Sequence, residues 1–114
     1  MLVVDPYAMG RVSLSAAIME LGYHVVAVGT AHEGRTILEL GAIDVIVADA
    51  DNAAIRRLIT DLQASGVSIP TVMLTTQHHR ETIPNTALLE KPTSLDALST
   101  AITASLIGSA SAAA

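Results

Sequence analysis

Short apolar runs alternate with segments of helical periodicity along most of the chain. The runs are rich in β-forming residues and occupy positions 1–4, 24–28, 43–48, 70–74 and 87–90. Between them, apolar residues recur three and four positions apart, which is typical of amphipathic helices. Strands that alternate with helices form a parallel sheet with right-handed connections. This order of segments therefore restricts the chain to an α/β fold.

Five strand–helix units in about 107 residues predict a flavodoxin-like, doubly wound, five-stranded parallel sheet with strand order 2-1-3-4-5. The run at 43–48 is apolar at nearly every position, as expected for a strand covered on both faces. The segment between Thr75 and Lys91 is short and interrupted by proline, so we expect a shortened or missing fourth helix. We assign residues 1–107 to one domain and the small residues of 108–114 to a disordered tail or linker stub.

Helix starts carry capping residues. The stretch 30–33 matches a capping box, and the stretch 93–96 is expected to open the last helix. Asp5 followed by Pro6 equally suits a helix start, with aspartate as N-cap and proline as the first helical residue. The residues expected to face the core from the third and last helices are Ile55, Leu58, Ile59 and Leu62, and Leu95, Leu98, Ile102 and Leu106.

Composition excludes several functions. The chain carries a formal charge of −5 and has only two aromatic residues, Tyr7 and Tyr23. Both features argue against nucleic-acid binding, which relies on a basic surface for the phosphate backbone and on rings that stack on bases. The absence of cysteine excludes disulfides and thiolate chemistry. No apolar run approaches the roughly 18 residues of a membrane span, and no signal peptide is evident, so we expect a cytoplasmic domain.

Four polar residues follow four of the predicted strands: Asp5, Asp49, Thr75 and Lys91. In a doubly wound sheet, ligands bind beyond the carboxyl ends of the strands, near the switch between the first and third strands. Two carboxylates, a hydroxyl and a lysine suit phosphoryl chemistry. We therefore expect the functional site at this edge.

The acidic cluster after the third strand has alternative interpretations. Asp49, Asp51 or Asn52 is able to cap the next helix, which needs only one cap. The spacing of Asp49 and Asp51 also resembles the Asp-x-Asp motif of haloacid-dehalogenase-like phosphatases, whose second aspartate is a general acid. Those enzymes carry the motif on their first strand and are longer. His78 and His79 are adjacent on a predicted loop, so we expect them to be solvated rather than to bind metal.

Five segments occur in a characteristic order: "LVVD", "ELGYHV", "DVIVAD", "IPTVMLTT" and "LLEKPTSLDAL". In these segments the chain resembles the CheY-like receiver domains of bacterial response regulators, over residues 1 to about 107. The resemblance implies that Asp49 accepts a phosphoryl group from a phosphohistidine, that Thr75 donates its hydroxyl to that group, and that Lys91 neutralises its charge. It also implies a cis peptide bond before Pro92 and a Mg²⁺ ion held in part by Asp5 and Asp49.

The sequence departs from the family pattern near this site. Pro6 replaces the second acidic residue after the first strand, and Thr76 stands where a small residue usually leaves room for the phosphoryl group. Leu88 replaces the aromatic switch residue. We therefore expect weak Mg²⁺ binding, with Asp51 as a compensating ligand.

The resemblance also implies partners. A histidine kinase or a phosphotransfer protein would supply the phosphoryl group, an output partner would receive the signal, and a homodimer is one candidate assembly. Catalysis would be limited to the domain's own phosphorylation and dephosphorylation. The alternative function is that of a pseudo-receiver, which binds a protein partner without phosphorylation.

Overall fold

The computed structural model describes residues 1–66, 69–76, 83 and 85–113, the last five of them by backbone alone. Within these residues the chain forms five strands and four helices. The strands are β1 (Leu2–Val4), β2 (Val26–Val28), β3 (Ile46–Asp49), β4 (Thr71–Thr75) and β5 (Thr86–Glu90). The helices are α1 (Ala8–Glu20), α2 (Ala31–Leu40), α3 (Ala53–Ala64) and α4 (Leu95–Ala113). None of these helices is long and apolar enough to cross a membrane, within the part of the chain that the structure describes.

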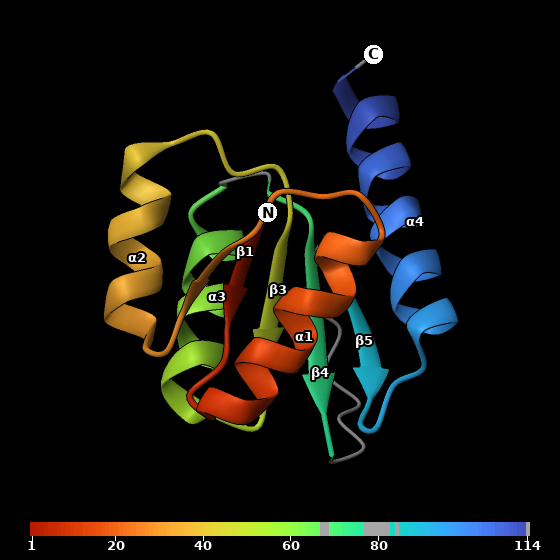
Figure 1. The fold of residues 1–114 in the computed structure, drawn as a ribbon. Helices are drawn as coiled ribbons and strands as arrows, with labels where there is room; N and C mark the ends of the chain where they lie inside the picture. The colour runs from red at the N-terminus through yellow and green to blue at the C-terminus, as the bar shows by residue number, and fades with distance from the viewer. Residues whose placement is uncertain (67–68, 77–82, 84, 114) are drawn as a thin grey trace.

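All five strands are parallel and lie in the order β2-β1-β3-β4-β5, which confirms the predicted topology (Figure 1). The chain moves outward from β1 to β2, returns to β3, and then continues to β4 and β5. The carboxyl ends of β1 and β3 therefore flank the position at which the connections change direction. That position is the usual ligand site in sheets of this kind.

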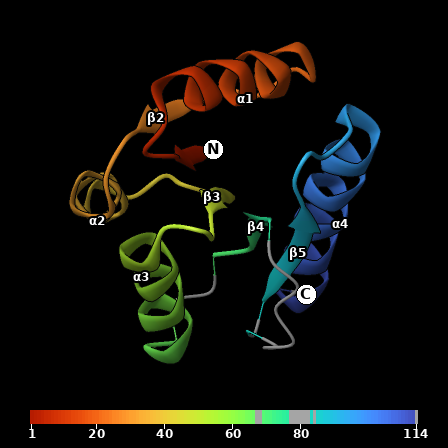
Figure 2. The same ribbon diagram turned by 90° about the horizontal axis from the view of Figure 1, so that it is seen from below.

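Helices cover both faces of the sheet, with α1 and α4 on one side and α2 and α3 on the other (Figure 2). Alternate residues of each central strand enter opposite cores, because successive side chains of a strand point to opposite faces. Val3 and Val47 lie in the core below α1 and α4, and Val4 and Ala48 lie in the core below α2 and α3. Burial on both faces explains why β1, β3 and most of β4 contain few polar residues.

Two helix starts differ from the sequence-based expectation. The helix α1 begins at Ala8, so Asp5 is not its N-cap and Pro6 is not its first residue. Instead, Asp5 Oδ1 accepts a hydrogen bond from the Tyr7 amide at 2.9 Å. At the last helix, the Ser94 hydroxyl accepts the Ala97 amide at 3.0 Å, so Ser94 caps α4 in place of Thr93.

The start of α4 also determines which residues it buries. Leu98 and Ile102 are buried in the core, as predicted, and Leu106 packs against it. Leu95, which we expected to be inward, is 43% exposed because it is the first residue of the helix and lies at its open end.

The C-terminal helix is longer than the sequence suggested. We expected a disordered tail or linker stub from residue 108, whereas α4 continues to Ala113. Alanine is the strongest helix former and recurs through this segment, so its small side chains do not end the helix. The division of the chain into residues 1–107 and 108–114 otherwise stays a prediction.

The predicted short or missing helix would lie between β4 and β5. Most of that segment, including His78 and His79, lies outside the described residues, and residues 76, 83 and 85 are not helical.

Candidate functional site

The site is built by the loops that follow β1, β3, β4 and β5. The register pairs Val4 of β1 with Ala48 of β3, so the residues that follow them, Asp5 after β1 and Asp49 at the end of β3, lie at the same edge of the sheet. Thr75 ends β4, and Lys91 immediately follows β5. The Lys91 amide donates to the Thr75 carbonyl at 2.7 Å, which fixes the ends of these two strands against each other.

Lys91 and Asp49 form the central ion pair. Lys91 Nζ lies 2.6 Å from Asp49 Oδ1, and the side chains are 26% and 2% exposed, respectively. The peptide bond between Lys91 and Pro92 is cis, as the family resemblance implied. A charge-assisted bond of this length to a buried carboxylate orients both side chains strongly.

One oxygen of Asp49 is left free for chemistry. Asp49 Oδ1 accepts Lys91 Nζ and the Asp51 amide, the latter at 3.0 Å. Asp49 Oδ2 is buried and has no hydrogen-bond partner among the described residues. A buried carboxylate oxygen normally has a partner, so this atom is an acceptor available to a cation or to a reaction.

Asp51 lies in the same site and binds the donors at the ends of β4 and β5. Its Oδ1 accepts the Thr75 hydroxyl at 2.8 Å and the Thr76 amide at 3.0 Å. Its Oδ2 accepts the Thr76 hydroxyl at 3.0 Å and Lys91 Nζ at 3.4 Å. The structure therefore joins Asp49, Asp51, Thr75 and Lys91 in one network, to which Thr76 also belongs.

The structure shows which of the three candidate residues caps α3. Asn52 Oδ1 accepts the Ile55 amide at 3.0 Å and is the N-cap. Asp49 and Asp51 are therefore not needed to start the helix. Asp51 is instead directed across the sheet edge toward the end of β4.

The network shifts two pKa values. Burial would raise the pKa of Asp51, but hydrogen bonds from Thr75 and Thr76 and the charge of Lys91 outweigh it and lower the pKa from 3.8 to about 2. Burial would lower the pKa of Lys91, but its hydrogen bond to Asp49 and the charges of Asp49 and Asp51 raise it above 10.5. Both side chains are thus held in their charged forms near neutral pH.

The lowered pKa of Asp51 predicts a pH-dependent contribution to stability. An aspartate whose pKa is lower in the folded chain than in the unfolded chain stabilises the folded state. This stabilisation is complete at pH values above the unfolded-state pKa, and it is lost as the pH falls toward the folded-state pKa. Because the Asp51 side chain is 23% exposed and screened by solvent, we expect it to contribute about 1 kcal/mol to the free energy of unfolding at neutral pH. The difference in free energy of unfolding between the wild type and Asp51→Asn should shrink between about pH 4 and pH 2 in urea titrations. A difference that stays constant across this range would contradict the prediction.

The predicted metal ligands are only partly assembled. The described residues contain no group of three acidic, histidine or cysteine side chains arranged to hold a metal. Both oxygens of Asp51 are bound to Thr75, Thr76 and Lys91, so Asp51 does not complete a set with Asp5 and Asp49 in this conformation.

Asp5 and Asp49 still fit a Mg²⁺ ion that keeps most of its water. Mg²⁺ is often bound through one or two carboxylates, with water and phosphate oxygens as the other ligands. Asp49 Oδ2 is the free acceptor. Next to Asp5, a Cβ at position 10 would lie 3.0 Å from Asp5 Oδ2, so glycine there leaves space for the carboxylate.

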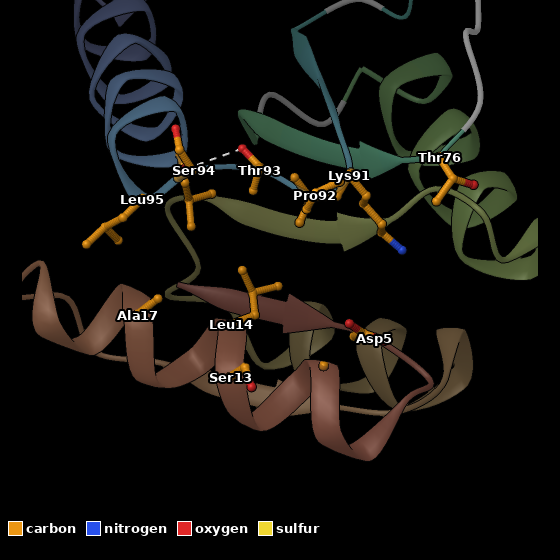
Figure 3. Close-up of a pocket in the computed structure, with 13 residues that line it drawn as sticks. Asp5, Ser13, Leu14, Ala17, Thr76, Lys91, Pro92, Thr93, Ser94 and Leu95 are labelled. Carbon is orange, nitrogen blue, oxygen red and sulfur yellow. Dashed lines mark hydrogen bonds between the residues drawn. The ribbon is translucent and has the colours of Figure 1, made fainter.

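A groove of about 540 Å³ opens beside the site, between α1 and the segment that leads from β5 into α4 (Figure 3). Leu14, Ala17 and Leu98 contribute to its apolar lining. Figure 3 shows Asp5 on the α1 side of the groove and Lys91 on the opposite side, with Thr76 near the same end. The groove therefore gives access from solvent to the edge of the sheet where the charged residues converge.

Sequence reasoning missed one member of the network. The family pattern marks Thr76 only as a residue larger than usual at its position, whereas in the structure both its amide and its hydroxyl bind Asp51. The consecutive threonines at the end of β4 were the available signal, because two adjacent hydroxyls at a strand end offer donors to an anion.

Comparison with solved structures identifies the fold. The chain superposes on the chemotaxis protein CheY4 of Vibrio cholerae with a TM-score of 0.81 and 22% identity, covering 92% of this chain and 96% of that one. It superposes on the signal receiver domain of an HD domain-containing protein from Pseudomonas fluorescens Pf-5 with a TM-score of 0.84 and 18% identity, covering 96% and 95%.

The receiver domain of a signal transduction histidine kinase from Syntrophus aciditrophicus gives a TM-score of 0.80 and 20% identity, covering 94% and 89%. No protein-family model and no curated protein sequence matches the chain. The chain therefore has the fold of response-regulator receiver domains, with a sequence that diverges strongly from these structures.

Proposed function

We propose that this chain is a divergent receiver domain of two-component signalling that accepts a phosphoryl group on Asp49. The observation that carries the proposal is the buried Asp49 carboxylate, held by Lys91 at 2.6 Å at the topological switch point of the sheet. Because Asp49 and Lys91 lie 42 positions apart in the sequence, their contact is a product of the fold rather than of local sequence. The likeness to solved receiver domains supports the same assignment.

In the proposed reaction, a carboxylate oxygen of Asp49 forms a bond to the phosphorus of a phosphohistidine. The bond between phosphorus and the imidazole nitrogen breaks, and its electron pair leaves with the imidazole. The product is an acyl phosphate on Asp49. Lys91 and the Thr75 hydroxyl are placed to stabilise the phosphoryl oxygens, because electrostatic stabilisation and positioning dominate phosphoryl transfer.

Asp5 and Asp49 would hold the Mg²⁺ ion that receiver domains generally use. When bound, the ion would offset the repulsion between the Asp49 carboxylate and the phosphoryl oxygens. The chain would act only on its own phosphorylation state. Its partners would be a histidine kinase or a phosphotransfer protein in the cytoplasm, together with an output partner.

A pseudo-receiver is the second candidate function. It is favoured by Asp51, which already binds the threonines and the lysine that would otherwise bind a phosphoryl group. The phosphatase alternative has less support, because the Asp-x-Asp motif begins at the end of the third strand rather than the first.

Phosphorylation from a small donor tests the proposal. We expect that incubation with acetyl phosphate and Mg²⁺ adds one phosphoryl group to the wild-type chain, seen by intact mass spectrometry. The Asp49→Asn variant should remain unmodified, because an amide is not a nucleophile toward phosphorus. Asp96→Asn, a change of equal size and charge on the exposed start of α4, is the matched control and should be modified like the wild type.

The two candidate functions give different results. If neither acetyl phosphate nor beryllofluoride produces an adduct at high donor concentration, the phosphorylated receiver is excluded and the pseudo-receiver is favoured. Modification that persists in Asp49→Asn would assign the acceptor elsewhere. Steady hydrolysis of a small phosphate ester that depends on Asp51 would instead support the phosphatase.

A further inference from the structure

The donors at the ends of β4 and β5 form a complete binding set for an oxyanion. Thr75 Oγ1, Thr76 N, Thr76 Oγ1 and Lys91 Nζ all lie within 2.8 to 3.4 Å of a single carboxylate, that of Asp51. Two hydroxyls, an amide and an ammonium group are the donors that proteins use to hold phosphate oxygens. In this structure the anion that they hold belongs to the chain itself.

Local geometry explains how Asp51 reaches these donors. Only Ala50 and Asp51 separate β3 from the Asn52 cap, so the connection to α3 is short. Asn52 performs the capping, and the Asp51 amide is fixed by Asp49 Oδ1 at 3.0 Å. Asp51 is thus anchored by its backbone with its carboxylate directed toward the end of β4.

We propose that Asp51 is an internal competitor for the phosphoryl group: its carboxylate occupies Thr75, Thr76 and Lys91 and must leave them before an oxyanion binds beside Asp49. This inference rests on the proposed function for its biological meaning, but the competition itself is a property of anion binding. A phosphoryl group on Asp49 would bring further negative charge next to Asp51, which shares Lys91 with Asp49. The two anions repel, so both do not occupy the same donors.

The competition has a regulatory consequence. Without a ligand, Asp51 keeps the donor groups of β4 and β5 ordered, while it slows phosphorylation. Loss of charge at position 51 should therefore increase both anion affinity and the rate of modification of Asp49. Displacing a carboxylate that accepts charge-assisted hydrogen bonds costs at least one such bond, so we expect an effect of about tenfold or more.

The test measures anion binding and phosphorylation separately on the full chain. Inorganic phosphate and beryllofluoride are titrated into the wild type, Asp51→Asn and Asp51→Ala, and binding is followed by the NMR shifts of the Thr75 and Thr76 amides. Asp51→Asn preserves the size of the side chain if Asp51→Ala unfolds. Glu39→Gln, on the exposed side of α2, removes one negative charge at a distance and controls for net charge.

We expect both Asp51 variants to bind inorganic phosphate at a concentration about tenfold or more below that of the wild type and Glu39→Gln. Equal titrations for the wild type and both Asp51 variants would overturn the inference. If acetyl phosphate modifies the wild type and the variants equally fast, the competition is absent while the receiver function stands. If no chain is modified but the Asp51 variants bind phosphate more tightly, the competition stands and the receiver function fails.

Discussion

Replacing Ile102 with alanine is expected to lower the free energy of unfolding by about 3 to 4 kcal/mol. Ile102 is fully buried on α4, in the core that also contains Val47, Val72 and Leu98. Truncation removes apolar contacts and leaves a cavity under the helix, since close-packed cores relax only partly. Urea denaturation followed by circular dichroism measures the loss.

The same helix supplies the control. Ile107 lies five residues further along α4 and is 61% exposed, so Ile107→Ala should change the free energy of unfolding by no more than about 0.5 kcal/mol. The substitution is chemically identical, and both positions lie inside the helix. If the two variants lose equal stability, burial against the sheet is not what makes Ile102 important.

The strand order could be predicted because it follows from a pattern that repeats along the chain. Short continuous apolar runs indicate the strands. Apolar residues three and four positions apart, such as Ile55 and Ile59, indicate the side of each helix that faces the core. Right-handed crossovers then leave few topologies for five strands. The positions of Asp5, Asp49, Thr75 and Lys91 followed from the same rule, since each ends or follows a strand.

The exact helix starts could not be predicted to the same degree. Thr93 and Ser94 are both good caps, and sequence does not decide between adjacent hydroxyls. The choice of Ser94 begins the helix at Leu95 and leaves that residue at the exposed end. The inward positions of Leu98, Ile102 and Leu106 do not depend on this choice, since residues three and four positions apart share a helix face wherever the helix begins. Only the end residue changes from inward to exposed.

The contacts of Asp51 also could not be predicted from the sequence. Asp51 and Thr75 lie 24 positions apart, so no local pattern connects them. We expected Asp51 to compensate for Pro6 as a metal ligand, yet its oxygens bind the hydroxyls and amide at the end of β4. The difference arises because the short loop after β3 brings Asp51 within hydrogen-bond distance of the two threonines at the end of β4.

A Lys91→Met variant is expected to lose about 2 to 3 kcal/mol of stability and to accept phosphate much more slowly. Lys91 contacts Asp49 and Asp51 at once, so its removal leaves a buried carboxylate beside a second one. Breaking a buried ion pair by removing one partner costs about 3 to 5 kcal/mol, and the partial exposure of Lys91 reduces this. Methionine preserves the aliphatic stem, so packing changes little. Urea denaturation and the acetyl phosphate assay give the two readouts.

A second substitution distinguishes lost charge pairing from lost packing. In the Asp49→Asn background the buried charge is absent. Lys91→Met should therefore lower the free energy of unfolding by less than half of the amount that it does in the wild type. Asp49→Asn alone should lower the free energy of unfolding less than Lys91→Met does, because Lys91 keeps Asp51 as a partner at 3.4 Å. If Lys91→Met costs the same in both backgrounds, Lys91 acts through packing and the ion pair contributes nothing. A cost confined to the Asp49 background would establish that this fold keeps the Asp49 carboxylate buried only because the single lysine of the chain neutralises it.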